Sequence, residues 1–263
     1  MGSQIEANVN DGIALVLLED PGTRNAISLD MAQALTRLVR EYVSDQAVHA
    51  VVLGGANGTF SSGGNLRDGL SHANGGAPDV SNLMMIYNEL CRTLFHFPKP
   101  IISVVSGVAA GGALGIALCT DVILMERKAR VSQAFIKIGL APDCGSSFLL
   151  SQRVGLVRAK EMTLSGRPVG AEEALHIGLA DSIHDEADIF RAAENQARCL
   201  SQGGGLAVMQ SKILLQDPFV SSFERALALE GAVQASLLQS ADFKTRAEAF
   251  ANSRSESRTG GRA

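Results

Sequence analysis

The stretch from Ile101 to Cys119 carries no charge, and it constrains the fold more than any other part of the sequence. Its first part, IISVV, is rich in β-branched residues and predicts a buried strand, whereas AGGALGIALC predicts a buried helix after a turn. The stretch approaches the ~20 apolar residues that span a membrane, but Pro98 and Pro100 precede it and glycines interrupt it. We therefore predict a buried strand–turn–helix unit that does not enter a membrane.

Strands and helices alternate around this unit. Strands are predicted at 12–19, from His49 and at DVILME, with a short strand in VSQAF. Helices are predicted at about 29–45 and 81–95, and the polar, glycine-containing segment 67–80 is predicted to be a mobile loop. Beyond Ser146 the pattern is helical almost throughout, with separate helices at 206–215 and 221–239. The fold class is therefore α/β with a helical C-terminal region.

The composition excludes several classes of function. The chain is 46% hydrophobic and has a net charge of −4, so it is too apolar to be disordered and has no basic surface for nucleic acid. Its cysteines form no CxxC pair, and its histidines lack metal-ligand spacing, so we expect no zinc site and a reducing compartment. The first ten residues are polar and include Glu6, which does not fit a secretory signal. We expect a cytoplasmic protein without a bound metal.

Two glycine clusters each follow a predicted buried strand. The glycines at 111, 112 and 115 do not match the dinucleotide-binding spacing, but a helix that begins near Gly112 presents free N–H groups to an incoming oxygen. In FSSGGNL, Gly63 and Gly64 can expose a second backbone N–H. Two converging donors are what an oxyanion hole requires. The alternatives are close helix packing at the first cluster and an ordinary turn at the second.

Five segments, in their order and spacing, resemble the crotonase (enoyl-CoA hydratase/isomerase) superfamily: RNAIS, FSSGGNL, KPIISVVSGVAAGGALGIALCTD, IKIGLAPDCGSS and LSGRPVGAEEALHIGLAD. The resemblance runs from about Gly12 to Phe250. It implies a crotonase-like spiral of ββα repeats over 1–200 and a helical C-terminal trimerisation region over 201–252. Residues 253–263 are predicted to be a flexible tail. The implied assembly is a homotrimer or a dimer of trimers, and the implied substrate is an acyl-CoA thioester, with CoA arriving as part of the substrate and no separate cofactor.

The resemblance also implies roles for individual residues. The backbone N–H groups of Gly64 and Gly112 are the positions that hold the thioester carbonyl, where they stabilise an enolate. Phe250 lies in the C-terminal helix that often reaches a neighbouring subunit's CoA, although the sequence around it (DFKTRAEAFANSR) departs from the usual pattern. The segments that resemble CoA-binding loops contain Arg24, Ala26, Gly64, Asn65 and Leu66.

The chain departs from the family at the residues that add water. Hydratases of this family use two glutamates, and the matching positions here are Gly115 and Phe135, neither of which moves a proton. A related dehalogenase subgroup needs a tryptophan at the position of Phe135, and this chain has no tryptophan. The usual hydration mechanism and dehalogenation are therefore both disfavoured.

One acid remains in the corresponding region. Asp143, in APDCG, matches the catalytic carboxylate of some family isomerases, among them the ring-epoxide isomerase of phenylacetate degradation, which IKIGLAPDCGSS resembles. The apolar neighbours in the sequence predict a raised pKa for this carboxyl group if they line the pocket; they are Ile136, Ile138, Leu140 and Phe148. The alternative is that Asp143 only caps a helix that begins near Ser146.

We therefore predict an acyl-CoA isomerase that shifts a double bond or rearranges a ring. Gly64 and Gly112 stabilise the thioester enolate in this hypothesis, and Asp143 moves the proton. The alternatives are a hydratase-like protein with non-standard residues, a CoA-thioester hydrolase or decarboxylase, and a catalytically silent oligomer that binds acyl-CoA.

Overall fold

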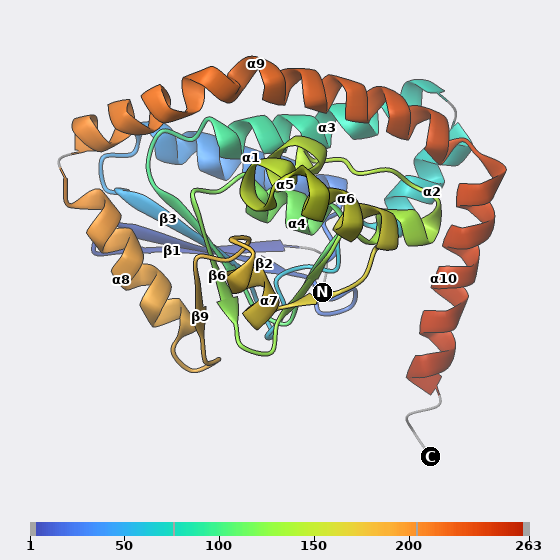
Figure 1. Cartoon of the computed structure of the whole chain (residues 1–263), viewed down its shortest axis with the longest axis horizontal. Helices are drawn as coiled ribbons and strands as arrows, with labels where there is room; N and C mark the ends of the chain where they lie inside the picture. The colour runs from blue at the N-terminus through green and yellow to red at the C-terminus, as the bar shows by residue number, and fades with distance from the viewer. Residues whose placement is uncertain (1–3, 76, 204, 260–263) are drawn as a thin grey trace.

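The computed structural model describes residues 4–75, 77–203 and 205–259, and its backbone is built on one large sheet and one small sheet (Figure 1). Within these ranges the large sheet has six strands in the order β1-β2-β3-β4-β6-β9, and the small sheet has the order β5-β7-β8. Among the strand pairs of the described residues, β1–β2 and β7–β8 are antiparallel and the others are parallel. The strands are β1 (Gln4–Asn10), β2 (Ile13–Glu19), β3 (Ala50–Gly55), β4 (Ile101–Val105), β5 (Val108–Ala110), β6 (Val122–Glu126), β7 (Arg130–Ser132), β8 (Val169–Gly170) and β9 (Ser182–His184).

The chain passes repeatedly between the two sheets, and helices follow these passes. The units β4-β5-α4 and β6-β7-α5 are ββα repeats of the kind that the family resemblance implies. The helices are α1 (Leu29–Ser44), α2 (Leu66–Gly75), α3 (Ala77–Phe95), α4 (Gly112–Leu118), the 3-10 helix η1 (Ala134–Ile138), α5 (Ser146–Val154), α6 (Leu156–Ser165), α7 (Ala171–His176), α8 (Ile189–Ser201), α9 (Gly205–Leu238) and α10 (Ala241–Thr259).

The large sheet is covered on both faces, which explains why β3 is buried along its whole length. Successive side chains of a strand point to opposite faces. Val51 and Leu53 accordingly belong to the main core with α1, α3 and α4, whereas Ala50 and Val52 pack in a smaller core with α8. Strands buried on both faces are typical of parallel sheets and read as continuous apolar runs in the sequence.

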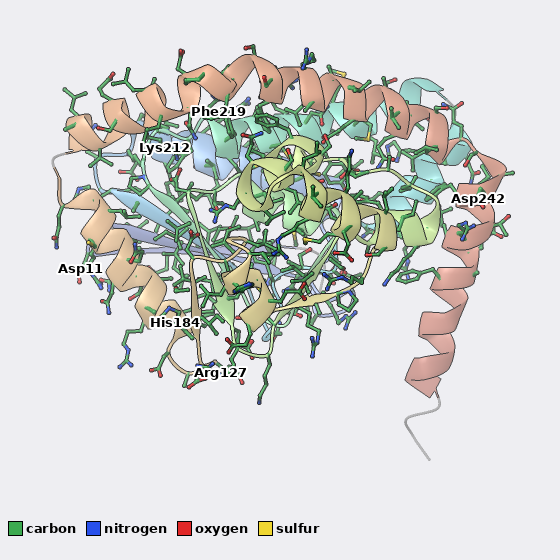
Figure 2. All side chains as sticks on the ribbon, in the orientation of Figure 1. Asp11, Arg127, His184, Lys212, Phe219 and Asp242 are labelled. Atoms are coloured by element: carbon green, nitrogen blue, oxygen red, sulfur yellow. The ribbon has the colours of Figure 1, made fainter. Side chains whose placement is uncertain are left out.

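Helix α9 lies along one side of the molecule, and α10 turns away from its end (Figure 1). Lys212 and Phe219 come from the first half of α9 (Figure 2), and the Lys212 ammonium lies 2.8 Å from a carboxylate oxygen of Asp121. Phe223 and Leu227, in the second half, are fully buried. These contacts hold α9 against the body of the protein both before and after Pro218, which lies inside the helix.

The charge-free stretch folds as the sequence predicts. Strand β4 occupies Ile101–Val105, β5 follows, and α4 begins at Gly112. All seven residues of α4 are buried. Over the ranges that the structure describes, no helix is both long enough and apolar enough to cross a membrane.

Three expectations for secondary structure are wrong. Segment 67–80 is not a loop, because α2 and the start of α3 occupy it, and Leu70, Ala73 and Val80 pack on the main core. The helices expected at 206–215 and 221–239 are one continuous helix, α9. An unexpected strand, β1, pairs antiparallel with β2 through a turn at Asp11 and Gly12. The expected tail, 253–263, coincides with the end of α10 and with 260–263, which lie outside the described residues.

Candidate active site

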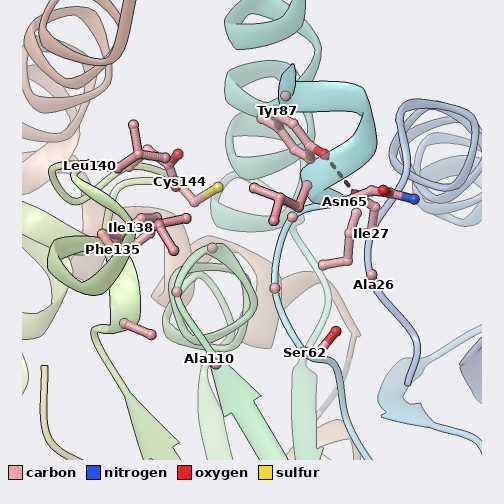
Figure 3. A pocket seen from close by; sticks show the side chains of 18 of the residues that line it. Ala26, Ile27, Ser62, Asn65, Tyr87, Ala110, Phe135, Ile138, Leu140 and Cys144 are labelled. Carbon is pink, nitrogen blue, oxygen red and sulfur yellow. Dashed lines mark hydrogen bonds between the residues drawn. The ribbon is translucent and has the colours of Figure 1, made fainter. Parts of the chain in front are cut away.

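All of the predicted site residues line one cavity of about 900 Å³. The close-up shows Cys144, Leu140, Ile138 and Phe135 on one side and Tyr87, Asn65, Ile27 and Ala26 on the other (Figure 3). Side chains of α2, α3, α4, α9 and α10 all reach this cavity, so segments far apart in the sequence contribute to it. The predicted residues that line it are Arg24, Ala26, Gly64, Asn65, Leu66, Gly112, Asp143 and Phe250.

The two predicted N–H donors lie on segments that approach each other closely. Gly64 forms a parallel bridge with Ile27, in which Gly63 and Asn65 make the hydrogen bonds, so the Gly64 N–H points away from that bridge. Within the described residues, neither Gly64 nor Gly112 donates its N–H to a protein acceptor. A Cβ on Gly112 would lie 4.0 Å from the Gly64 nitrogen. Both N–H groups are therefore available at the same end of the cavity.

Glycine is required where these two segments touch. Gly63 has φ +107°, and a Cβ there would lie 2.7 Å from the carbonyl oxygen of Ala110. Gly111 has φ +56° and directs its N–H to the carbonyl of Ser132, which sets the start of α4. These backbone conformations are strained for any residue with a side chain. The glycines thus bring the two donors together and leave the space above them open.

Asp143 is held from outside its own loop. Its Oδ2 accepts a 2.8 Å hydrogen bond from the Gln234 amide on α9. Its Oδ1 is buried and has no hydrogen-bond partner among the described residues, and it lies 3.4 Å from the position of a Cβ on Gly112. Burial raises the pKa of the Asp143 carboxyl, and the hydrogen bond from Gln234 and the neighbouring Cys144 thiol oppose that rise. This carboxyl group therefore lies beside Gly112 and is easier to protonate than an ordinary aspartate.

The capping alternative for Asp143 is not what the structure contains. Helix α5 begins after Gly145 without a side-chain cap from its own segment. Glu230 of α9 instead accepts the N–H of Gly145 at 2.8 Å and that of Ser147 at 2.9 Å. A carboxylate at a helix N-terminus satisfies N–H groups that have no partner within the helix. Glu230 thus does the capping, and the Asp143 side chain faces the cavity.

Gly115 and Phe135, which match the two hydratase glutamates, exclude a carboxyl group for different reasons. A Cβ on Gly115 would lie 2.7 Å from Cys144 Cβ and 2.9 Å from the Cys144 carbonyl oxygen, so the Asp143–Cys144 loop occupies that space. Phe135 is buried and lines the cavity with an apolar ring. Asp143 is accordingly the only carboxyl group among the described residues that line the cavity.

The remainder of the cavity wall is largely apolar. Ile138 and Leu140 line it as expected, whereas Ile136 is 45% exposed and lies outside the wall, as does Phe148. Arg24, Arg67 and Lys137 supply positive charge to the lining, and all three are exposed. An apolar interior with exposed cations is compatible with an acyl chain inside and an anionic group near the solvent.

Two further side chains, the Cys144 thiol and the Glu89 carboxyl, are poor candidates for catalysis. Cys144 has φ +57° and lies near the buried thiol of Cys91. This contact and burial raise its pKa well above that of a free cysteine, so it is a thiol rather than a nucleophilic thiolate at neutral pH. Glu89 is exposed and pairs with Arg40 rather than facing the cavity.

Sequence reasoning missed three polar residues around the site. Tyr87 lines the cavity and donates its hydroxyl to the Ile27 carbonyl at 2.7 Å, which ties α3 to the Gly64 loop. Gln234 and Glu230 come from α9 and are 1% and 4% exposed. Their only signal was two polar residues four positions apart, which places them on one helix face.

Comparison with known proteins assigns the family. Residues 8–259 match the enoyl-CoA hydratase/isomerase family. The chain is 32% identical over 256 residues to a probable enoyl-CoA hydratase from Rhodobacter capsulatus, covering 97% of this chain and 98% of that protein. It is 31% identical over 257 residues to a 1,2-epoxyphenylacetyl-CoA isomerase from Escherichia coli K12, with coverage of 97% and 98%.

The fold comparison agrees with the sequence comparison. The structure matches the crystal structure of an enoyl-CoA hydratase from Mycobacterium avium subsp. paratuberculosis with a TM-score of 0.85 at 29% identity, covering 93% of this chain and 97% of that chain. Hydratases and an isomerase both appear among these relatives, so the names do not distinguish the two reactions. The chain has the crotonase fold and belongs to the enoyl-CoA hydratase/isomerase family, the crotonase superfamily.

Proposed function

We propose that this protein is an acyl-CoA isomerase that moves a double bond or rearranges a ring next to the thioester. One observation carries the proposal: Asp143 is the only carboxyl group among the described cavity-lining residues, and its unpartnered Oδ1 lies beside Gly112. An isomerisation returns to one carbon the proton that it removes from another. A single carboxylate is sufficient for this transfer.

The proposed mechanism uses the two glycine amides and this carboxylate. The N–H groups of Gly64 and Gly112 bind the thioester oxygen and stabilise the negative charge that develops when a C–H bond is broken. Losing one such donor typically costs ~10²–10³ in rate. Asp143 takes the proton at Oδ1, the electrons move through the enolate, and Asp143 then gives the proton to a different carbon. No oxidant, reductant or water is consumed.

Water addition is a poorer fit to this cavity. The family's hydratases hold and activate water with two glutamates, and here position 115 has no room for a side chain while Phe135 presents an apolar ring. Aligning water in an apolar cavity needs several polar partners. The 31% identity to an isomerase supports isomerisation over hydration. The probable hydratase is 32% identical, so identity alone does not separate the two reactions.

The proposal is tested with purified protein, a 3-enoyl-CoA and crotonyl-CoA. We expect isomerisation of the 3-enoyl-CoA by the wild type and a loss of ~10²-fold or more in Asp143→Asn, because asparagine cannot carry the proton. Asp11→Asn is the matched control, since Asp11 is exposed at φ +48°, a conformation that asparagine tolerates. Strong hydration of crotonyl-CoA, or isomerisation that survives Asp143→Asn, contradicts the proposal.

We also propose that the protein assembles as a homotrimer or a dimer of trimers. Helix α9 leaves large apolar side chains exposed on the outside of the molecule, including Leu214 at 73% and Leu215 at 74%. Contiguous exposed apolar residues of this size are typical of protein interfaces. The same helix reaches the cavity through Gln234, so assembly and the site share one element.

A further inference from the structure

Gln234 contacts the loop from Ala141 to Ser147, which carries Asp143, at two points. Its Nε2 donates to Asp143 Oδ2 at 2.8 Å, and its Oε1 accepts the Ala141 N–H at 3.3 Å. The side chain is 1% exposed, so water does not replace either contact. It lies on the same helix as Glu230, which binds the other end of this loop through Gly145 and Ser147.

The orientation of the Gln234 amide follows from these partners. A backbone N–H can only donate, so the group that faces Ala141 must be the amide oxygen. The amide nitrogen therefore faces Asp143. The reverse orientation would bring two donors together at Ala141 and two acceptors together at Asp143. Gln234 can consequently donate to Asp143 but cannot accept a proton from it in this arrangement.

The two oxygens of Asp143 are therefore chemically different. An N–H of Gln234 points at Oδ2, and a proton placed there would compete with that hydrogen bond. Oδ1 has no such donor among the described residues and lies next to Gly112, where the substrate carbonyl is expected. We propose, on the basis of the isomerase function above, that Gln234 is a positioning residue that leaves Oδ1 of Asp143 as the oxygen that carries the proton.

Other titratable groups lie near Asp143 in the interior. Burial raises the pKa of Tyr87, from α3, and the contact with the Cys91 thiol together with burial raises the pKa of the Cys144 thiol, which keeps both groups neutral at neutral pH. Glu230, from α9, is buried with a pKa of about 7 and repels a charged Asp143. A pH profile of activity therefore contains contributions from both Asp143 and Glu230, and the test must observe Asp143 separately.

The experiment follows the protonated Asp143 carboxyl by infrared difference spectroscopy during a pH titration of the whole protein. The band is assigned by its absence in Asp143→Asn. Gln234→Leu removes the donor, and we expect the band to persist to higher pH, because the hydrogen bond from Gln234 favours the carboxylate. Gln234→Glu keeps the size and an acceptor for Ala141 but faces Asp143 with a second carboxyl, and we expect a further shift upward.

Steady-state kinetics provides the second measurement. We expect kcat to fall by about 10- to 100-fold in Gln234→Leu, as for loss of a hydrogen bond to a charged group, with KM nearly unchanged. The acidic limb of the kcat profile should move in the same direction as the infrared band. Gln239→Leu is the matched control, because Gln239 follows the last residue of α9, is exposed, and among the described residues its side chain bonds only to the Ala235 carbonyl.

The outcomes separate this inference from the proposed function. An Asp143 band that titrates at the same pH in the wild type, Gln234→Leu and Gln234→Glu overturns the positioning role, whatever the activity. A shifted band together with a wild type that does not isomerise any enoyl-CoA leaves Gln234 as the residue that orients Asp143 and rejects the isomerase function. Circular dichroism of each variant establishes that it is folded.

Discussion

At position 115 only a residue without a side chain fits the packing around the site. Gly115 lies in buried helix α4, against the backbone of Cys144. A Cβ there would meet a backbone oxygen at 2.9 Å, and a backbone atom cannot rotate away as the end of a flexible side chain can. The helix and the Asp143 loop therefore pack directly on each other, and this packing places Asp143 beside Gly112.

We expect Gly115→Ala to destabilise the protein and to reduce isomerisation. Alanine is favoured over glycine in a helix by ~1 kcal/mol, but overpacking a core costs ~1–3 kcal/mol, so the net effect is a loss. Urea denaturation and the 3-enoyl-CoA assay measure the two effects. Gly205→Ala is the control, because a Cβ at that position meets nothing within 4 Å. A variant as stable and active as the wild type would show that the loop adapts at no cost.

At the scale of an element, α9 has two faces with different tasks. Its inner face carries Glu230 and Gln234, which together bind four groups of the loop from Ala141 to Ser147. Its outer face carries exposed leucines. Residues four positions apart lie on the same face of a helix. Glu230 and Gln234 can therefore form hydrogen bonds with both ends of the same loop.

The titration of Glu230 makes its contribution to the free energy of unfolding depend on pH. Burial raises its pKa to about 7, from an ordinary 4.5. Between these two values the folded protein binds more protons than the unfolded chain, so the Glu230 contribution to the free energy of unfolding falls as pH rises. We take the free energy of unfolding of the wild type minus that of Glu230→Gln. We expect this difference to decrease by about 1.4 kcal/mol for each unit by which the pH rises across this window.

Urea denaturation of both proteins at pH 5, 6, 7 and 8 and at one protein concentration measures this difference. Taking the difference cancels the titration of groups that both proteins share. A difference that stays constant, or that increases with pH, would mean that Glu230 is charged in the folded protein throughout. The two backbone N–H groups that it accepts would then outweigh its burial.

At the scale of the whole molecule, the exposed leucines of α9 predict self-association. We expect light scattering after size exclusion to give the wild type a mass that is a multiple of three chains of 27.6 kDa. Changing Leu214→Glu together with Leu215→Glu should lower that mass, because buried charges without partners oppose association. Val43→Glu, at a 42% exposed position on α1, is the control. A monomeric wild type, or an unchanged mass in the double variant, contradicts the proposed assembly.

Local patterns predicted the buried elements well and the interrupted ones poorly. Strand β4 and helix α4 follow directly from IISVV and AGGALGIALC, since burial on all sides leaves an unbroken apolar run. Segment 67–80 looked like a loop because glycines and polar residues separate Leu70, Ala73 and Val80, which meet in the main core only when α2 and α3 form. The helices expected at 206–215 and 221–239 are joined through Pro218, and buried contacts on both sides hold α9 as one helix despite a cost of ~3 kcal/mol.

The candidate site divides in the same way. Each predicted site residue lines the cavity, because these residues were identified from compact motifs whose spacing is contained in a few positions. Their catalytic and CoA-binding roles stay predictions. Tyr87, Glu230 and Gln234 were not predicted, because nothing near them in the sequence relates them to the glycine loops. The relation exists only through helices α3 and α9 packing around the cavity.

By itself, the sequence determined the α/β class, the two glycine turns, the lack of both hydratase glutamates and the acid that remains at 143, because these are properties of adjacent residues. The tertiary structure alone decided that position 115 has no room for a side chain and that Asp143 faces the cavity instead of capping α5. It also decided which oxygen of Asp143 is free. The physical reason is distance along the chain: Gln234 is 91 residues from Asp143, and only the packing of α9 brings their side chains within 2.8 Å.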